Sequence, residues 1–240
     1  MTFLEQQLPT SLAKNFRKGL VLALILGATL SIALSALFEL LIGVSLVAIA
    51  TVFPLLEEIF KGLSILLVAL FVWKTIPSRR YGAILGASTG LGFAISENII
   101  YSVQYALSNA SNSAELIASR WVGVPFMHVT WDAFVGIGIF VLLAQKSSRR
   151  GTPLWLAMPF LLAGVLAHML WNSIAVALSG IDVFGVILVD VIVIFIPFAI
   201  MLRDFLGGHF NLQGFLKSAT EPRAPQILIP PQPPPPPPPP

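Results

Sequence analysis

Six long apolar segments, separated by short polar stretches, dominate the pattern of the chain. They lie near residues 19–38, 41–75, 81–105, 121–144, 154–178 and 182–202. A helix needs about 20 apolar residues to cross the hydrocarbon core of a bilayer, and each segment is about that long or longer. Strands of a membrane barrel would instead alternate apolar and polar positions over about 10 residues. The pattern therefore predicts an all-α fold, a polytopic bundle of about six transmembrane helices.

The second segment, residues 41–75, is longer than one perpendicular helix requires. It contains Pro54, and a proline inside a helix removes a backbone donor and bends the helix axis. The segment is therefore either one long, tilted helix kinked near Pro54 or a pair of short helices. The first interpretation gives six spans in total and the second gives seven.

The basic residues decide between six spans and seven. They form four clusters: Lys14/Arg17/Lys18, Lys74/Arg79/Arg80, Lys146/Arg149/Arg150 and Arg203/Lys217. The linkers near 38–40, 106–120 and 179–182 contain a single basic residue, Arg120. Lys and Arg are enriched in the cytoplasmic loops of membrane proteins, and six spans place all four clusters on one side. We therefore expect six spans, a second helix kinked near Pro54, and both termini in the cytoplasm.

The composition is typical of a membrane protein and excludes every kind of site that needs a cysteine. Hydrophobic residues make up 56% of the chain and charged residues only 10%, whereas soluble domains carry about 25% charged residues. The chain has no cysteine, which excludes disulfides, thiol nucleophiles and cysteine–zinc sites. We expect a multi-pass protein of the cell membrane, in contact with the lipid bilayer and without a nucleic-acid partner.

Three regions follow from the pattern. Residues 1–18 are a cytoplasmic N-terminal lead, residues 19–205 are the transmembrane bundle, and residues 206–240 are a cytoplasmic tail. The tail ends in PQPPPPPPPP, and a proline run of this kind is extended and forms no packed core. We therefore expect the functional residues in the bundle and a disordered polyproline segment at the end.

Ionisable and amide residues occur inside four of the apolar segments. They are Glu57, Glu58 and Lys61 in the second, Glu97 and Asn98 in the third, His128 and Asp132 in the fourth, and His168 and Asn172 in the fifth. In the six-span topology, Glu97, His128 and His168 lie roughly 10 to 15 Å below the outer ends of their helices, at 1.5 Å per residue. Glu57 lies somewhat deeper. The polar residues therefore share one layer in the outer half of the bilayer.

The spacing within each helix agrees with this layer. Four pairs are four residues apart and so share a helix face: Glu57/Lys61, Phe93/Glu97, His128/Asp132 and His168/Asn172. A charge at a helix centre costs about 2.5 to 3.5 kcal/mol in the membrane, so these faces should meet one another and not lipid. The sequence predicts one buried polar centre.

The polar centre has a structural and a functional interpretation. Polar side chains between membrane helices often serve as packing contacts, worth about 0.6 kcal/mol on average. Three glutamates, a lysine and two histidines in one layer exceed that need, so we interpret the layer as functional. An enzyme, a proton-coupled transporter and a non-catalytic membrane scaffold are the three candidates. The sequence shows no internal repeat, which argues against a transporter.

Four short motifs in the same layer resemble those of a known family. They are EEIFK, GFAISEN, HVTWD and HMLWN, in this order along the chain. Together they are similar to the PrsW family of intramembrane proteases, within the wider assembly of CAAX prenyl endopeptidases and bacteriocin-processing proteins. The resemblance covers residues from about 20 to 203. It implies an intramembrane endopeptidase whose partner is a membrane-anchored, anti-sigma-factor-like protein, cleaved on its extracytoplasmic side.

Peptide hydrolysis needs an activated water, a group that stabilises the oxyanion and an acid for the leaving amine. In one version, Glu57 or Glu58 activates the water beside Lys61. His128 and His168 then polarise the carbonyl or protonate the amine, and Asn172 is a further donor. Asp132 is expected to orient His128.

In the other version, His128, His168 and Glu97 bind a zinc ion, and Glu57 is the base. We favour the glutamate version, in which no cofactor is required. The candidate catalytic residues of the two versions are Glu57, Glu58, Lys61, Glu97, His128, His168 and Asn172.

Overall fold

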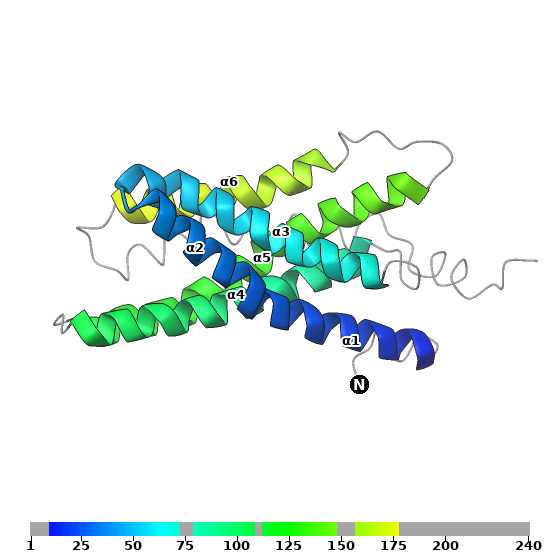
Figure 1. The fold of residues 1–240 in the computed structure, drawn as a ribbon, viewed down its shortest axis with the longest axis horizontal. Helices are drawn as coiled ribbons and strands as arrows, with labels where there is room; N and C mark the ends of the chain where they lie inside the picture. Colours follow the sequence, from blue (N-terminus) through cyan, green and yellow to red (C-terminus); the bar gives the residue numbers. More distant parts are fainter. Residues whose placement is uncertain (1–9, 73–78, 109–111, 148–156, 178–240) are drawn as a thin grey trace, which may run out of the picture.

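The computed structural model describes residues 10–72, 79–108, 112–147 and 157–177, and every regular element in these ranges is a helix (Figure 1). The predicted all-α fold is thus confirmed. The elements are α1 (Thr10–Leu26), η2 (Gly27–Ser31), α2 (Ile32–Ile42), η3 (Ala48–Val52), α3 (Phe53–Val72), α4 (Arg79–Ser108), α5 (Ser113–Ser147) and α6 (Met158–Ala177). The short elements η2 and η3 are π-helical turns.

Four of the described helical segments are long and apolar enough to cross a membrane: Lys14–Ile42, Arg79–Ser108, Ser113–Leu143 and Met158–Ala177. The protein is therefore a membrane protein. Helix α3 is not among the four, because its 20 residues include the charged residues Glu57, Glu58 and Lys61. The span expected near residues 182–202 lies outside the described residues. Six spans and cytoplasmic termini accordingly stay predictions.

A turn at Gly43, inside the second predicted segment, separates α2 from the next helix. Helix α2 ends at Ile42, and Gly43 has a φ of 81°, which residues with a Cβ rarely adopt. The side-chain oxygen of Ser45 accepts the Ala48 N–H at 3.1 Å, as a residue at a helix start does. The next helix passes through η3 directly into α3, and Pro54 is the second residue of α3. A π-helical turn thus lies just before Pro54, where the sequence predicted a kink.

Helices α4 and α5 approach each other closely because α4 has glycines every four residues. A Cβ at Gly82 would lie 2.6 Å from the Gly136 oxygen of α5, and one at Gly86 would overlap the Asp132 carbonyl. At Gly90 a Cβ would lie 2.5 Å from the Asp132 carboxylate. Small residues at this spacing let membrane helices pack backbone to backbone. The glycine row therefore places the polar residues of α5 directly beside α4.

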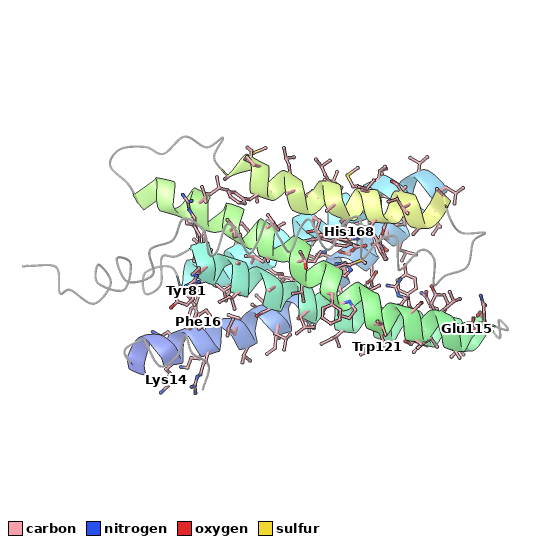
Figure 2. The ribbon with its side chains drawn as sticks, turned by 180° about the vertical axis from the view of Figure 1, so that it is seen from behind. Lys14, Phe16, Tyr81, Glu115, Trp121 and His168 are labelled. Carbon is pink, nitrogen blue, oxygen red and sulfur yellow. The ribbon has the colours of Figure 1, made fainter. Side chains whose placement is uncertain are left out.

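One end of the bundle has an apolar core. Phe16 packs edge-on against Tyr81 at 4.6 Å, and Ile65, Leu85 and Phe140 belong to the same buried cluster. Figure 2 places Phe16 and Tyr81 at one end of the bundle and Glu115 at the other, with His168 between them. The polar centre thus begins where this apolar core ends.

Large apolar side chains also cover much of the outside of the bundle. Around the α2–η3 turn, Leu40, Leu41, Val44, Leu46 and Val47 are 68–81% exposed. An outward-facing apolar surface of this extent is typical of helices in contact with lipid.

Candidate functional site

Four helices bring the predicted polar residues together. Glu57, Glu58 and Lys61 come from α3, Glu97 from α4, His128 and Asp132 from α5, and His168 from α6. The residues from α3, α5 and α6 are at most 6% exposed, and the Glu97 side chain is 13% exposed. Two groups can be distinguished within the set, and His128 belongs to both.

The first group, the Lys61 cluster, consists of Glu58, Lys61, His128 and Asp132. Lys61 is fully buried, and its Nζ forms an ion pair with Glu58 Oε1. The same Nζ lies 2.9 Å from His128 Nδ1 and 3.5 Å from Asp132 Oδ2. It also lies 4.6 Å from the centre of the Phe93 ring. These contacts explain how a lysine is accommodated at membrane depth, where an unpaired charge is costly.

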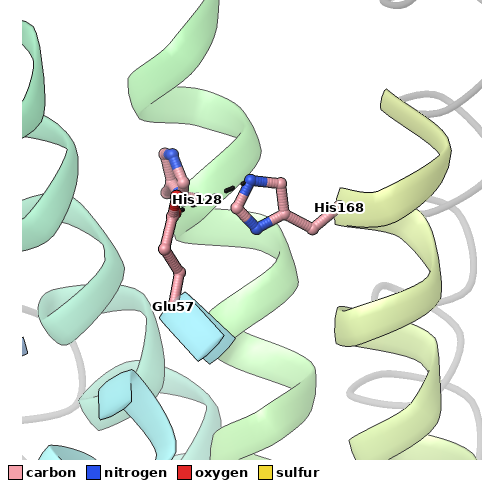
Figure 3. A group of neighbouring side chains, drawn as sticks. All are labelled: Glu57, His128 and His168. Carbon is pink, nitrogen blue, oxygen red and sulfur yellow. Dashed lines mark ion pairs between the residues drawn. The ribbon is translucent and has the colours of Figure 1, made fainter. Parts of the chain in front are cut away.

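The second group, the Glu57 cluster, consists of Glu57, His128 and His168 (Figure 3). His168 Nε2 lies 3.7 Å from Glu57 Oε2, and His168 Nδ1 lies 2.8 Å from Glu58 Oε1. The His168 ring stacks on Trp131, with 4.5 Å between ring centres and an angle of 21°. Glu57 Oε2 is buried and has no hydrogen-bond partner among the described residues. His168 is therefore fixed on two sides and faces a carboxylate oxygen that makes no hydrogen bond to this part of the chain.

The contacts assign the ring protons of both histidines. An ionised carboxylate only accepts hydrogen bonds, so His168 donates from Nδ1 to Glu58 and keeps a lone pair on Nε2. An ammonium only donates, so Lys61 donates to Nδ1 of His128 and the His128 proton sits on Nε2. Nε2 of His168 is thus the basic nitrogen that faces Glu57.

Glu97 has an arginine partner that sequence reasoning missed. Its Oε2 lies 2.9 Å from Arg120 Nη2 and 3.3 Å from His128 Nε2. The Arg120 guanidinium also lies over the Tyr101 ring at 3.8 Å, and Asn98 Nδ2 donates to the Arg120 carbonyl at 3.2 Å. The signal was present in the sequence, because a lone arginine beside the outer half of the membrane is a natural partner for an intramembrane glutamate.

Two residues have contacts other than the expected ones. Asp132, expected to orient His128, lies 3.5 Å from the Nζ of Lys61, and the described residues show no hydrogen bond between it and His128. Asn172 Nδ2 donates to the Ile49 carbonyl of η3 at 3.0 Å. Its amide nitrogen is thus engaged with a backbone group.

The two groups differ in how their negative charge is balanced. Four carboxylates, from Glu57, Glu58, Glu97 and Asp132, surround the centre, and two cations, Lys61 and Arg120, contact them. Lys61 lies in the Lys61 cluster, and Arg120 contacts Glu97. Among the described residues, no lysine or arginine forms an ion pair with Glu57.

The Glu57 cluster also fits a metal ion by donor type. Its three residues each offer a ligand atom, and these atoms lie within 4.8 Å of one another. Two histidines and one carboxylate are a ligand set typical of catalytic zinc. The His168 Nδ1–Glu58 bond matches the carboxylate partner that metal-binding histidines usually have. Glu97, which the sequence placed in the ligand set, is paired with Arg120 instead.

A comparison with known families identifies the chain. The sequence model described as PrsW family intramembrane metalloprotease matches residues 12–202. The chain belongs to the PrsW family. The resemblance carried by the four motifs is thereby confirmed, and a protease that works within the membrane is indicated. Searches of curated proteins and of solved structures gave no match.

Proposed function

We propose that this PrsW protease hydrolyses a peptide bond of a membrane-anchored protein and that the Glu57 cluster is its reaction centre. The observation that carries the proposal is the pairing of Glu57 Oε2, buried and without a hydrogen bond to any described residue, with the oriented Nε2 of His168 at 3.7 Å. A buried carboxylate oxygen beside a basic nitrogen is suited to take a proton from a water molecule.

Glu57 is the proposed proton acceptor. A water oxygen about 2.8 Å from both Glu57 Oε2 and His168 Nε2 would complete a triangle with the two atoms, so one water can contact both. Glu57 would take a proton from this water as its oxygen attacks the scissile carbonyl carbon. The same proton is then available for the amine nitrogen when the C–N bond breaks.

Glu58 has a different role in the proposal. Its Oε1 already contacts both Lys61 and His168, so its charge is committed to these partners. Glu58 would therefore orient His168 and would not take the proton of the water. Lys61 would pair with Glu58 and hold His128 in place through Nδ1.

The same residues provide the candidate metal site. Glu57, His128 and His168 would hold a divalent ion, with zinc as the best match to the donor set. His128 would become a ligand only by giving up its Nε2 proton or the hydrogen bond from Lys61. When bound, such an ion would polarise the attacking water and the scissile carbonyl. It would also offset the excess of carboxylates over cations around the centre.

The substrate class follows from the family and from the depth of the site. By resemblance, a membrane-anchored, anti-sigma-factor-like protein is the expected substrate. The predicted topology puts the centre in the outer half of the bilayer, which suits a scissile bond near the extracytoplasmic surface. The proposed cellular location is the cell membrane.

Cleavage of a membrane-anchored fluorogenic peptide by the purified protein in proteoliposomes tests the proposal. Glu57→Gln should lower kcat by about 10²- to 10⁴-fold, because Gln keeps the shape and removes the proton acceptor. Glu115→Gln, at an exposed position near the start of α5, is the matched control and should cleave like wild type. A Glu57→Gln protein that cleaves at the wild-type rate would contradict the assignment. Folded wild type that cleaves no membrane-anchored peptide would favour a transporter or scaffold.

A further inference from the structure

The π-helical turn η3 leaves one backbone carbonyl without a partner in its own helix. In an α-helix, the Ile49 carbonyl would accept from the N–H of Phe53, but that N–H donates to Ala48 instead. In a π-helix, the donor would be the N–H of residue 54. Residue 54 is proline, which has no N–H. Ile49 therefore needs a donor from elsewhere.

Asn172 supplies this donor from another helix. Its Nδ2 lies 3.0 Å from the Ile49 oxygen. An unsatisfied backbone group is costly at membrane depth, and prolines are tolerated in membrane helices where neighbouring helices satisfy the freed groups. The bond is thus more than a surface contact, because the carbonyl has no intrahelical alternative.

The position of this bond connects it to the reaction centre. Asn172 is one turn beyond His168 on α6, and Ile49 is two turns before Glu57 on the η3–α3 helix. The bond therefore joins the two helices whose residues make the Glu57–His168 pair. In the other π-helical turn, η2, the Ala28 carbonyl accepts from Ser96 Oγ at 2.8 Å. Ser96 directly precedes Glu97, so a side chain next to a polar residue of the site again satisfies a π-turn carbonyl.

We propose that Asn172 is a positioning residue: it anchors α6 on the Ile49 carbonyl and thereby holds His168 against Glu57 and Glu58. The catalytic part of this inference rests on the proposed function. The anchoring part is independent of it and can be measured in a protein without activity. The inference differs from the expectation that Asn172 donates to the substrate.

A mutant cycle with Pro54 separates the two roles of Asn172. Asn172→Ala should lower kcat by about tenfold or more with little change in KM, because His168 loses its position while the substrate contacts stay. Pro54→Ala restores an N–H that can serve the Ile49 carbonyl. In the Pro54→Ala background, Asn172→Ala should then lower kcat by only about threefold or less. An equal loss of kcat in both backgrounds would overturn the inference and indicate that Asn172 donates to the substrate.

The same four proteins are compared by thermal unfolding in detergent, which needs no activity. The Tm loss caused by Asn172→Ala should shrink in the Pro54→Ala background. Coupling in Tm without any peptide cleavage by wild type would support the anchor and reject the proposed function. Peptide cleavage by wild type, with no coupling between Asn172 and Pro54 in Tm or kcat, would support the proposed function and reject the anchor.

A distance measurement keeps the inference testable if the Pro54→Ala protein does not fold. The chain has no cysteine, so spin labels can be attached at introduced cysteines, one in place of Val47 and one in place of Leu170, both at least half exposed. With Asn172 present, the label–label distance should be narrowly distributed. Asn172→Ala should broaden or lengthen it, and Asn172→Gln, which keeps a donor, should broaden it less. An unchanged distribution in Asn172→Ala would overturn the inference.

Discussion

The Lys61 cluster and the Glu57 cluster share His128 and differ in where their positive charge comes from. In the first, the ammonium of Lys61 lies among Glu58, Asp132 and His128, so the chain supplies its own cation. In the second, Glu57 faces His168 and has no lysine or arginine partner among the described residues. In the proposed function, the two clusters have different roles. The Lys61 cluster holds the helices and the histidines in place, and the Glu57 cluster binds the ligand.

Removal of the Lys61 charge should have the largest effect. Lys61→Met leaves Glu58 and Asp132 buried without their cation, and breaking a buried pair in this way costs about 3 to 5 kcal/mol. We expect a large fall in Tm and in the yield of folded protein. Lys14→Met, at an exposed position of α1, is the control and should unfold like wild type.

A second change would show whether this loss is electrostatic. Asp132→Asn added to Lys61→Met removes one of the stranded carboxylates and should recover part of the Tm. If Lys61→Met alone unfolds at the wild-type temperature, the Lys61 cluster does not hold the bundle together.

The adjacent glutamates should respond in opposite ways when each is made neutral. Glu58→Gln weakens a charged hydrogen bond to Lys61, so it should destabilise the protein by about 1.5 to 3 kcal/mol. Glu57→Gln removes a buried carboxyl group that has no lysine or arginine partner among the described residues, so the metal-free protein should keep or raise its Tm. Thermal unfolding after metal removal measures both. Equal losses of Tm for the two variants would contradict the distinction between the clusters, because the two glutamates would then contribute equally to stability.

Arg120 should have a smaller effect, through Glu97 and His128. Arg120→Gln removes the guanidinium that holds Glu97, and loss of such an outer partner typically costs about 10- to 100-fold in activity. Arg120→Lys keeps the charge and should recover part of the loss, chiefly in kcat. Peptide cleavage by the two variants measures this. Wild-type activity in Arg120→Gln would show that the contact between Glu97 and His128 does not depend on Arg120.

The sequence predicted the helical fold and the convergence of its polar residues, because membrane depth and four-residue spacing place side chains without knowledge of the packing. It could not decide which glutamate pairs with Lys61. Glu57 and Glu58 are both within one helical turn of Lys61, and the choice depends on where α5 places His128 and Asp132. That placement depends in turn on the backbone contact between α4 and α5.

The role of Asn172 was also beyond the sequence. Its spacing from His168 put it on the right face of α6, but its partner is a backbone carbonyl. That carbonyl is free because the helix before Pro54 widens into a π-turn, a change of hydrogen-bond register that Pro54 alone does not reveal. Arg120 was noted as the only basic residue of the outer linkers, whereas its contact with Glu97 joins α5 to α4 and depends on their packing.

Metal content, measured by mass spectrometry on purified protein, tests most directly whether the Glu57 cluster takes its cation from outside the chain. Wild type should bind about one divalent ion per chain, zinc by preference. Glu57→Gln and His168→Ala should lose this ion, and Asp132→Asn, which alters only the Lys61 cluster, should keep it. Exhaustive chelation should abolish peptide cleavage, and zinc should restore it. A wild type that cleaves the peptide with no bound metal would contradict a metal ion at the Glu57 cluster and would leave Glu57 to activate the water alone. An ion retained in both Glu57→Gln and His168→Ala would contradict this cluster as the place where the metal binds.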